Sequence, residues 1–352
     1  MKKFALVLWT IILILSLGST ALAKDLRVAF IAFGDVNTDP FYKENYSGVQ
    51  AFANSRPRTR VRIFQRGKIT TSNARQAMRE AMKRYDTIIY CEAVDPELTE
   101  FVKANPEIKF IFTQDWPVNK DGKNIELPNV YAMRFKEEEA GFLAGLAAGL
   151  SSKTKKVASV HGEVIPSNIK IQEGFAAGVK YSNENYNTNV KVIELGEFAG
   201  INSSTGENVG GNYIGSFTNS AKGAIIGKAL INSGCDVIFI SASEAGDGVI
   251  DSAKESGQVK IIGCDTDQFD SGFDGDKNII LTSVIKLISP QVLSVLNDIE
   301  SGYFRSGNYL LGTSNHAVGY VKGEHCLLNL DITEKLDTAI DLMKSGELVP
   351  LK

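Results

Sequence analysis

Charged side chains follow two short apolar runs in the second half of this 352-residue chain. Asp265 comes directly after the run Val259 to Cys264, and Lys286 follows Ile279 to Ile285. Short β-branched runs bounded by glycine and polar residues are typical of buried parallel strands. Because ligands of open α/β sheets bind beyond the carboxyl ends of the strands, we expect both side chains in one cleft. The pair could make charge-assisted hydrogen bonds to ligand hydroxyls, or form a structural ion pair.

A glycine-bearing turn and an aromatic residue are candidates for the same cleft. Gly246 follows the run Val237 to Ile240 and opens the segment Gly246-Asp247-Gly248-Val249. Phe217 precedes a predicted helix, where it could fill the core or contact a planar ligand. Aromatic rings from two sides of a cleft would sandwich such a ligand.

The segment after the first predicted strand carries polar and aromatic residues within eight positions. Asp39 before Pro40 is typical of a helix N-cap followed by proline in the first turn, although its carboxylate could also face a cleft. Two aromatic residues follow, and they could pack against the helix start or present flat faces to a heteroaromatic ring. The candidate ligand contacts here are Asn37, Asp39, Phe41 and Tyr42.

Gln114-Asp115-Trp116 follows the carboxyl end of the predicted strand Lys109 to Phe112, just as the segment with Asp39 follows the first predicted strand. The Asp115 carboxylate could accept hydrogen bonds from the edge of a base or from a sugar hydroxyl. It could instead cap a helix or lie in a solvated turn. Trp116 is the aromatic candidate beside it.

The common enzyme motifs are missing from the sequence. No Gly-x-Gly-x-x-Gly fingerprint follows the first strand, and neither a Walker phosphate loop nor a Gly-x-Ser-x-Gly elbow is present. His161, His316 and His325 are scattered without metal-ligand spacing. We therefore expect a binding protein with no cofactor, no metal and no catalytic residues.

Strand and helix patterns alternate along the chain with short connections. The first half reads Leu26 to Phe33, Phe41 to Ala53, Arg60 to Phe64, Asn73 to Lys83, Thr87 to Tyr90, Pro96 to Ala104, Lys109 to Phe112, Val130 to Met133 and Lys136 to Leu150. A second series begins at Lys156, and Gly196 to Gly215 is expected to be a long loop. This alternation predicts an α/β fold of two lobes, each a doubly wound parallel sheet, with the ligand between them. We expect the chain to cross between the lobes more than once, on a hinge.

The ends and the composition limit the possible partners. Lys2-Lys3, the apolar run Phe4 to Leu17 and Ala21-Leu22-Ala23 predict a signal peptide over residues 1–23, cleaved to a periplasmic protein without a lipid-bearing cysteine. A net charge of −3 argues against nucleic acid as a partner. The arginines between Arg56 and Arg66 indicate an edge strand with a solvated face. Cys91, Cys235, Cys264 and Cys326 match no zinc pattern, and we expect buried free thiols.

Several motifs together resemble the basic membrane protein family of ABC-transporter substrate-binding proteins, whose best-known members are purine nucleoside receptors. The resemblance runs from about residue 26 to 325. Its motifs are Asn129-Val130 with Phe135 to Gly145, Gly174 to Val179, Gly215-Ser216-Phe217, Gly246 to Val249, Ile262 to Gln268 and Leu281 to Lys286. Each motif is weak alone, but the ordered set is specific.

The resemblance implies a type I periplasmic-binding fold and a function in import through a membrane permease. It further implies that Phe41 and Phe217 stack on a base, that Asp115 contacts the base, and that Gly246, Asp265 and Lys286 contact the ribose. The first loop departs from the usual Ser-Phe-Asn-Gln, because Pro40-Phe41-Tyr42-Lys43 stands there and Tyr42 replaces the asparagine that would address the base. Recognition of the ribosyl group is therefore the firmer expectation.

The resulting hypothesis is a monomeric solute-binding protein that captures a purine nucleoside or a related ribosylated heteroaromatic. The expected lobes are residues 24–151 with about 266–305, and residues 152–265 with about 306–352. Three alternatives stay open: a different ligand such as riboflavin, a secreted nucleosidase, and a ligand sensor that signals to a membrane receptor.

Overall fold

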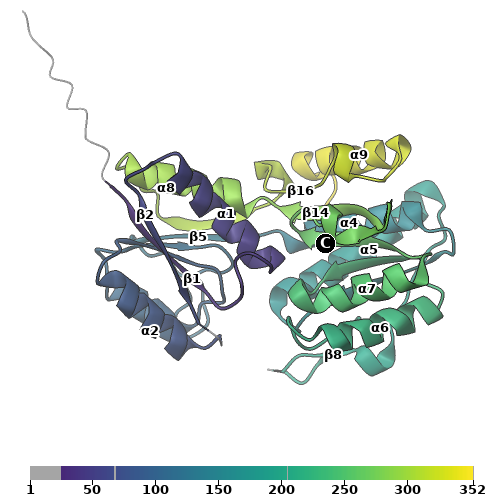
Figure 1. The fold of residues 1–352 in the computed structure, drawn as a ribbon, viewed down its shortest axis with the longest axis horizontal. Coiled ribbons are helices and arrows are strands. Elements are labelled where there is room, and N and C mark those ends of the chain that lie inside the picture. The colour runs from purple at the N-terminus through teal and green to yellow at the C-terminus, as the bar shows by residue number, and fades with distance from the viewer. Residues whose placement is uncertain (1–24, 67–68, 204, 352) are drawn as a thin grey trace, which may run out of the picture.

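Two α/β lobes make up the computed structural model, which describes residues 25–66, 69–203 and 205–351 (Figure 1). The predicted signal peptide over residues 1–23 lies outside these residues. Within the described ranges, no helix has the length and apolarity that a membrane crossing requires. The predicted fold class, two doubly wound sheets joined by crossovers, is confirmed.

The first lobe is built on a six-stranded parallel sheet in the order β15-β5-β4-β3-β1-β2. Helices α1 and α8 pack together on one face, and α2 and α3 cover the other (Figure 1). The strands are β1 (Arg27–Ala32), β2 (Arg60–Gln65), β3 (Thr87–Tyr90), β4 (Lys109–Phe112), β5 (Val130–Phe135) and β15 (Gly307–Leu311). The helices are α1 (Pro40–Asn54), α2 (Thr71–Met82), α3 (Pro96–Lys103) and α8 (Ile288–Glu300).

The second lobe has a sheet in the order β16-β14-β11-β10-β6-β7, in which β16 runs antiparallel to β14. Helices α6 and α7 cover one face, and α4, α5 and α9 lie on the other (Figure 1). The strands are β6 (Lys156–His161), β7 (Lys191–Val192), β10 (Val237–Ser241), β11 (Lys260–Asp265), β14 (Ile280–Lys286) and β16 (Val318–Tyr320). The helices are α4 (Glu137–Ser151), α5 (Pro166–Tyr186), α6 (Ser220–Asn232), α7 (Asp247–Ser256) and α9 (Leu330–Ser345).

The chain crosses between the lobes three times, after β5, after β14 and after β15. The predicted lobe boundaries differ from this arrangement and need correction. Helix α4 packs on α5 and belongs to the second lobe, β14 pairs with β11 in the second sheet, and β15 pairs with β5 in the first. Buried strands of both sheets have the same apolar, β-branched composition, so a sequence pattern does not show which sheet a strand joins.

Three smaller predictions can be compared with the structure. Strand β2 lies at the edge of its sheet with an alternating exposed face, as the arginines predicted. The segment expected to be a loop, Gly196 to Gly215, contains a short antiparallel pair, β8 (Gly200–Ile201) with β9 (Asn208–Gly210). All four cysteines are free; three are buried, whereas Cys326 is half-buried.

Glycines let helices α4 and α5 approach until their backbones touch. A Cβ atom on Gly145 would lie 2.0 Å from the carbonyl oxygen of Phe175, and one on Gly141 would lie 2.1 Å from that of Ile171. Such distances lie well inside van der Waals contact, so a side chain would force the helices apart. This packing fixes α4, the helix that begins directly after the first crossover.

We therefore predict that Gly145→Ala lowers the free energy of unfolding by about 2 kcal/mol, because the added methyl group meets backbone rather than a movable side chain. Gly196→Ala is the matched control, because no atom of the described residues lies within 4 Å of its added Cβ. Urea denaturation of both variants measures the difference, and equal stabilities would contradict the close packing.

Candidate ligand-binding cleft between the lobes

Three charged side chains meet where the second sheet reaches the hinge. The Lys286 Nζ lies 2.9 Å from Asp265 Oδ1 and 3.3 Å from Glu137 Oε1. Lys286 is 4% exposed and Glu137 is 5% exposed, so water screens their charges little. Burial disfavours the ammonium, but Asp265 and Glu137 outweigh that effect and raise the pKa of Lys286. Burial, with Asp265 nearby, raises the pKa of Glu137. The two side chains are close, as predicted, and they form the ion pair that the sequence analysis gave as the structural alternative.

Asp265 itself has a left-handed backbone, with φ of 70°. Such a conformation is uncommon for a residue other than glycine, and asparagine and aspartate tolerate it best. Strained residues of this kind concentrate at binding sites, where the surrounding structure holds them in place. The conformation ends β11 and turns the chain at the mouth of the cleft.

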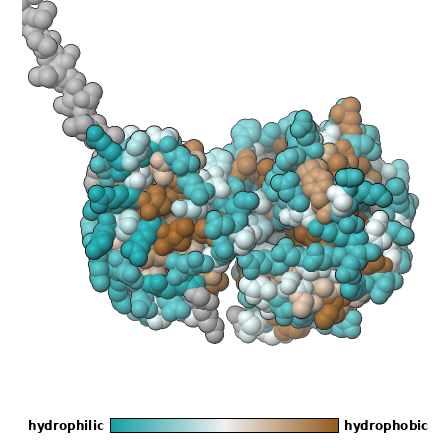
Figure 2. Space-filling model, viewed as in Figure 1, coloured by the Kyte–Doolittle hydropathy of each residue, from teal (hydrophilic) through white to brown (hydrophobic). Residues whose placement is uncertain are grey.

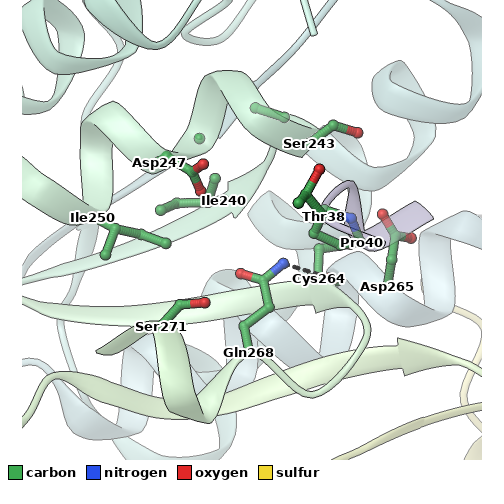
Figure 3. A pocket seen from close by; sticks show the side chains of 12 residues that line it. Thr38, Pro40, Ile240, Ser243, Asp247, Ile250, Cys264, Asp265, Gln268 and Ser271 are labelled. Carbon is green, nitrogen blue, oxygen red and sulfur yellow. Dashed lines mark hydrogen bonds between the residues drawn. The ribbon is translucent and has the colours of Figure 1, made fainter. Parts of the chain in front are cut away.

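A cavity of about 130 Å³ lies between the lobes beside Asp265 (Figure 3). Thr38 and Pro40 line it from the first lobe, and Gly246, Asp265 and Gln268 are among its second-lobe residues. Thr38 Oγ1 donates a hydrogen bond of 3.4 Å across the cleft to Glu244 Oε1. Ligand pockets commonly measure about 300 to 1,000 Å³, so this cavity is smaller than a typical ligand pocket. The space-filling surface is notched between the lobes (Figure 2).

Gly246 presents its backbone to this cavity at the start of α7. A Cβ atom there would lie 2.6 Å from Cγ2 of Ile240, so a side chain would collide with the end of β10. The free backbone N–H groups at the beginning of a helix are available to hydrogen-bond acceptors. The predicted position of Gly246 beside Asp265 is therefore found in the structure.

The start of α1 brings Phe41 to the charged cluster from the opposite lobe. The Lys286 Nζ lies 6.0 Å from the centre of the Phe41 ring, and the ring is half-buried. Helix α1 reaches toward the second lobe with this end (Figure 1). The structure thus gathers Phe41, Asp265, Lys286 and Gly246 at one place between the lobes.

Asp39 caps this helix, which confirms the capping interpretation. Its Oδ1 accepts hydrogen bonds from the backbone N–H groups of Phe41 at 2.8 Å and Tyr42 at 3.2 Å, and the residue is 5% exposed. Burial raises the pKa of Asp39 to about 6, and Glu244 and Asp265 across the cleft add to the rise. Asn37 is exposed and donates to Asp35, as in a turn.

We predict that Asp39→Asn increases stability in a pH-dependent way. The pKa of Asp39 rises on folding from 3.8 to about 6, so the folded state binds more protons than the unfolded state in this range. The wild type therefore loses stability as the pH is raised from about 4 to about 6. Asparagine keeps the cap without the charge, so the variant should be about 1 to 2 kcal/mol more stable at pH 8 and little changed at pH 4. Urea denaturation across this range measures the difference; a constant difference would contradict the account.

Tyr42 lies in the core of the first lobe instead of at the cleft surface. Its ring is buried, lies against Gly34 and meets Phe41 edge-on with centroids 5.5 Å apart. Its hydroxyl donates a hydrogen bond to the Glu92 carboxylate. Burial raises the pKa of Glu92 to about 7, and Asp39 and the second-lobe Glu163 contribute to the rise. The Tyr42 hydroxyl is therefore engaged by Glu92, a residue that the sequence pattern did not single out.

Asp115 is occupied by partners within its own lobe. Its carboxylate accepts hydrogen bonds from the backbone N–H groups of Val94 and Trp116, and from the Arg134 guanidinium, whose Nε lies at 2.7 Å. The Trp116 ring stacks under Arg134 at 4.7 Å, and its Nε1 donates to the Tyr309 carbonyl oxygen. The carboxylate is 20% exposed and already engaged in an ion pair with Arg134.

Phe217 lies on the second lobe, half-buried over Gly162. A Cβ atom on Gly162 would be 2.3 Å from the Phe217 ring, and the Phe217 carbonyl oxygen accepts a hydrogen bond of 2.8 Å from Ala245. The ring is therefore seated next to the turn that leads to Gly246. Among the described residues, Phe217 is not one of those that line the cavity.

Sequence reasoning missed two further residues of this region. Glu137 stands in the motif Phe135 to Gly145, but three consecutive glutamates at a helix start are ordinarily attributed to the helix dipole. Gln114 lies beside Asp115, and its Oε1 is buried without a hydrogen-bond partner among the described residues. The position of Gln114 just beyond the carboxyl end of β4 could have indicated it as a candidate from the sequence.

Comparison with known proteins identifies the family. The family model Bmp, described as ABC transporter substrate-binding protein PnrA-like, matches residues 26–209 and 207–344. The chain belongs to the Bmp family. The resemblance inferred from the motifs is confirmed, and with it the class of ABC-transporter substrate-binding proteins.

The alignments with relatives of this Bmp-family protein cover most of the chain. A CD4+ T-cell-stimulating antigen of Listeria innocua is 28% identical over 353 aligned residues, covering 95% of this chain and 91% of the relative. The ABC transporter nucleoside-binding protein BmpA of Lactococcus lactis is 26% identical over 80% of this chain and 77% of its own length. A solute-binding protein of an ABC transporter system from Aeropyrum pernix K1 superposes with a TM-score of 0.73, at 18% identity and 92% coverage of both chains.

Proposed function

We propose that this Bmp-family protein captures a purine nucleoside, or a related ribosylated heteroaromatic, between its two lobes. The observation that carries the proposal is the Asp265–Lys286 ion pair beneath the Phe41 ring. An acceptor and a charged donor side by side suit vicinal hydroxyl groups, and an adjacent aromatic face suits a planar base. Phe217 would cover the opposite face of that base, and the backbone of Gly246 would contact the sugar.

The base end is where this protein would differ from a typical nucleoside receptor. Asp115 is engaged with Arg134, and Tyr42 directs its hydroxyl to Glu92, so Gln114 and Glu92 are the polar groups left to address a base. A riboflavin-like ligand fits the same aromatic and hydroxyl contacts. The relative named as nucleoside-binding, from Lactococcus lactis, supports the nucleoside.

Delivery to the membrane permease of an ABC importer completes the proposal. The protein would be exported by its cleavable leader, act as a monomer in the periplasm, and present both lobes to the permease after closing on the ligand. A ligand-induced shift toward a closed form is the event that a permease can distinguish.

Uptake of a radiolabelled purine nucleoside by a deletion strain tests this transport role. We expect uptake to fall in the deletion strain and to return with the wild-type gene. Unchanged uptake would contradict transport and leave a sensory role. Chromatography of nucleoside incubated with purified protein is the companion assay, because release of free base would indicate a nucleosidase.

A further inference from the structure

The carboxylate of Glu137 connects the candidate ligand site to the hinge. Lys286 is the last residue of β14, directly before the second crossover, and Glu137 is the first residue of α4, directly after the first crossover. Their side chains meet at 3.3 Å, while the same ammonium reaches Asp265 at 2.9 Å. A ligand group that binds Lys286 therefore contacts the residue before the second crossover. Through Glu137 it is also linked to the residue after the first crossover.

Lys136 and Glu139, which flank Glu137, form hydrogen bonds to the third crossover. The Glu139 carboxylate accepts a hydrogen bond of 2.6 Å from the backbone N–H of Thr313, and its other oxygen lies 2.9 Å from the Lys136 ammonium. The backbone N–H of Lys136 donates to the Leu311 carbonyl oxygen at 2.8 Å. Residues 136–139 thus contact both other crossovers, and Glu139 is buried like Glu137.

The buried cluster has more negative than positive charge. Glu137 and Asp265 share one ammonium, and Oε2 of Glu137 has no hydrogen-bond partner among the described residues. Two carboxylates in contact with the Lys286 ammonium fix its direction more narrowly than one would. Without Glu137, the long lysine side chain would be free to adopt other rotamers.

We infer that Glu137 is a positioning residue, which holds the Lys286 ammonium against Asp265 so that the pair meets the ligand's vicinal hydroxyls in a fixed geometry. This inference rests on the proposed function for its ligand, but the geometry that it describes exists without one. It assigns a role to a residue that would not itself touch the ligand. It also explains why a charged residue is buried at the hinge despite the cost of removing it from water.

The Glu137→Gln variant tests the inference against two ligands. Glutamine keeps the size and removes the charge, so adenosine should bind the variant about tenfold more weakly than the wild type, by calorimetry. The Kd of 2′,3′-dideoxyadenosine, which lacks both hydroxyls, should change less than twofold. Equal losses for both ligands would indicate a merely structural role and overturn the inference, as would an unchanged Kd for adenosine.

Glu138→Gln is the matched control on the same helical turn. Its carboxylate lies 4.0 Å from Lys170 of α5, so we expect both Kd values to stay within twofold of the wild type. An adenosine-specific loss in this control as great as in Glu137→Gln would also overturn the assignment, because any nearby charge would then suffice.

A ligand-independent measurement keeps the inference separate from the proposed function. If wild-type protein binds neither ligand, the nucleoside proposal fails, and the nitrogen-15 NMR signal of the Lys286 ammonium decides the positioning role. We expect its protons to exchange with water at least tenfold faster in Glu137→Gln than in the wild type, because one buried partner is lost. An unchanged exchange rate would overturn the inference.

Discussion

Lys286→Met is expected to lower the free energy of unfolding by about 3 to 5 kcal/mol. The substitution keeps the apolar stem but removes the ammonium that Asp265 and Glu137 share. Removing one partner of a buried ion pair leaves the other charges uncompensated, and here two carboxylates would face each other without a cation. Glu137 is only 5% exposed, so water has little access to replace the lost partner.

Urea denaturation at pH 7 measures this effect, with Lys170→Met as the matched control. Lys170 is exposed and lies 4.0 Å from Glu138, so its loss should change stability by less than about 1 kcal/mol. A Lys286→Met variant as stable as this control would show that the cluster is not buried as described. Partial recovery in Lys286→Met combined with Glu137→Gln would support the charge explanation.

Asp265→Ala is expected to weaken ligand binding at least tenfold, and up to about a hundredfold, because the buried ligand hydroxyls lose their charged acceptor. Asp265 borders the cavity and holds the Lys286 ammonium at 2.9 Å, so its loss removes one contact and disorients another. Calorimetric titration gives the Kd of each variant. An unchanged Kd would remove Asp265 from the ligand site.

Two further variants separate charge from backbone conformation at this position. Asp265→Asn tolerates the left-handed φ of 70° and keeps the shape, so a loss of affinity there is due to the missing charge. Asp270→Ala changes an exposed carboxylate five residues away and should leave the Kd within twofold of the wild type. If only Asp265→Ala were impaired, the missing acceptor or the backbone strain would be the cause, and the charge would not.

The sequence was sufficient to predict the elements and one end of the candidate site. Apolar runs with glycine boundaries indicated β10, β11 and β14, and the rule that parallel strands end at one edge brought Asp265, Lys286 and Gly246 together. Local chemistry also predicted the Asp39 cap, because the sequence Asp-Pro fixes both the acceptor and the first helical φ angle. Each of these rests on short-range pattern and fold class.

Features that depend on long-range contacts could not be predicted in this way. Arg134 lies 19 residues from Asp115, and only the pairing of β4 with β5 brings it close enough to engage that carboxylate. Tyr42 meets Glu92 across 50 residues of sequence, and Glu137 meets Lys286 across 149 residues. The assignment of α4, β14 and β15 to lobes failed for the same reason.

Calorimetric titration of refolded, ligand-stripped mature protein tests the central claim most directly. The ligands are guanosine, adenosine, inosine, cytidine and riboflavin. The account predicts tight one-to-one binding of purine nucleosides, with Phe41 and Phe217 on the base and the Asp265–Lys286 pair on the sugar. Binding of riboflavin alone would keep the cleft but contradict the nucleoside, and no binding of any of the five would contradict the proposed ligand class.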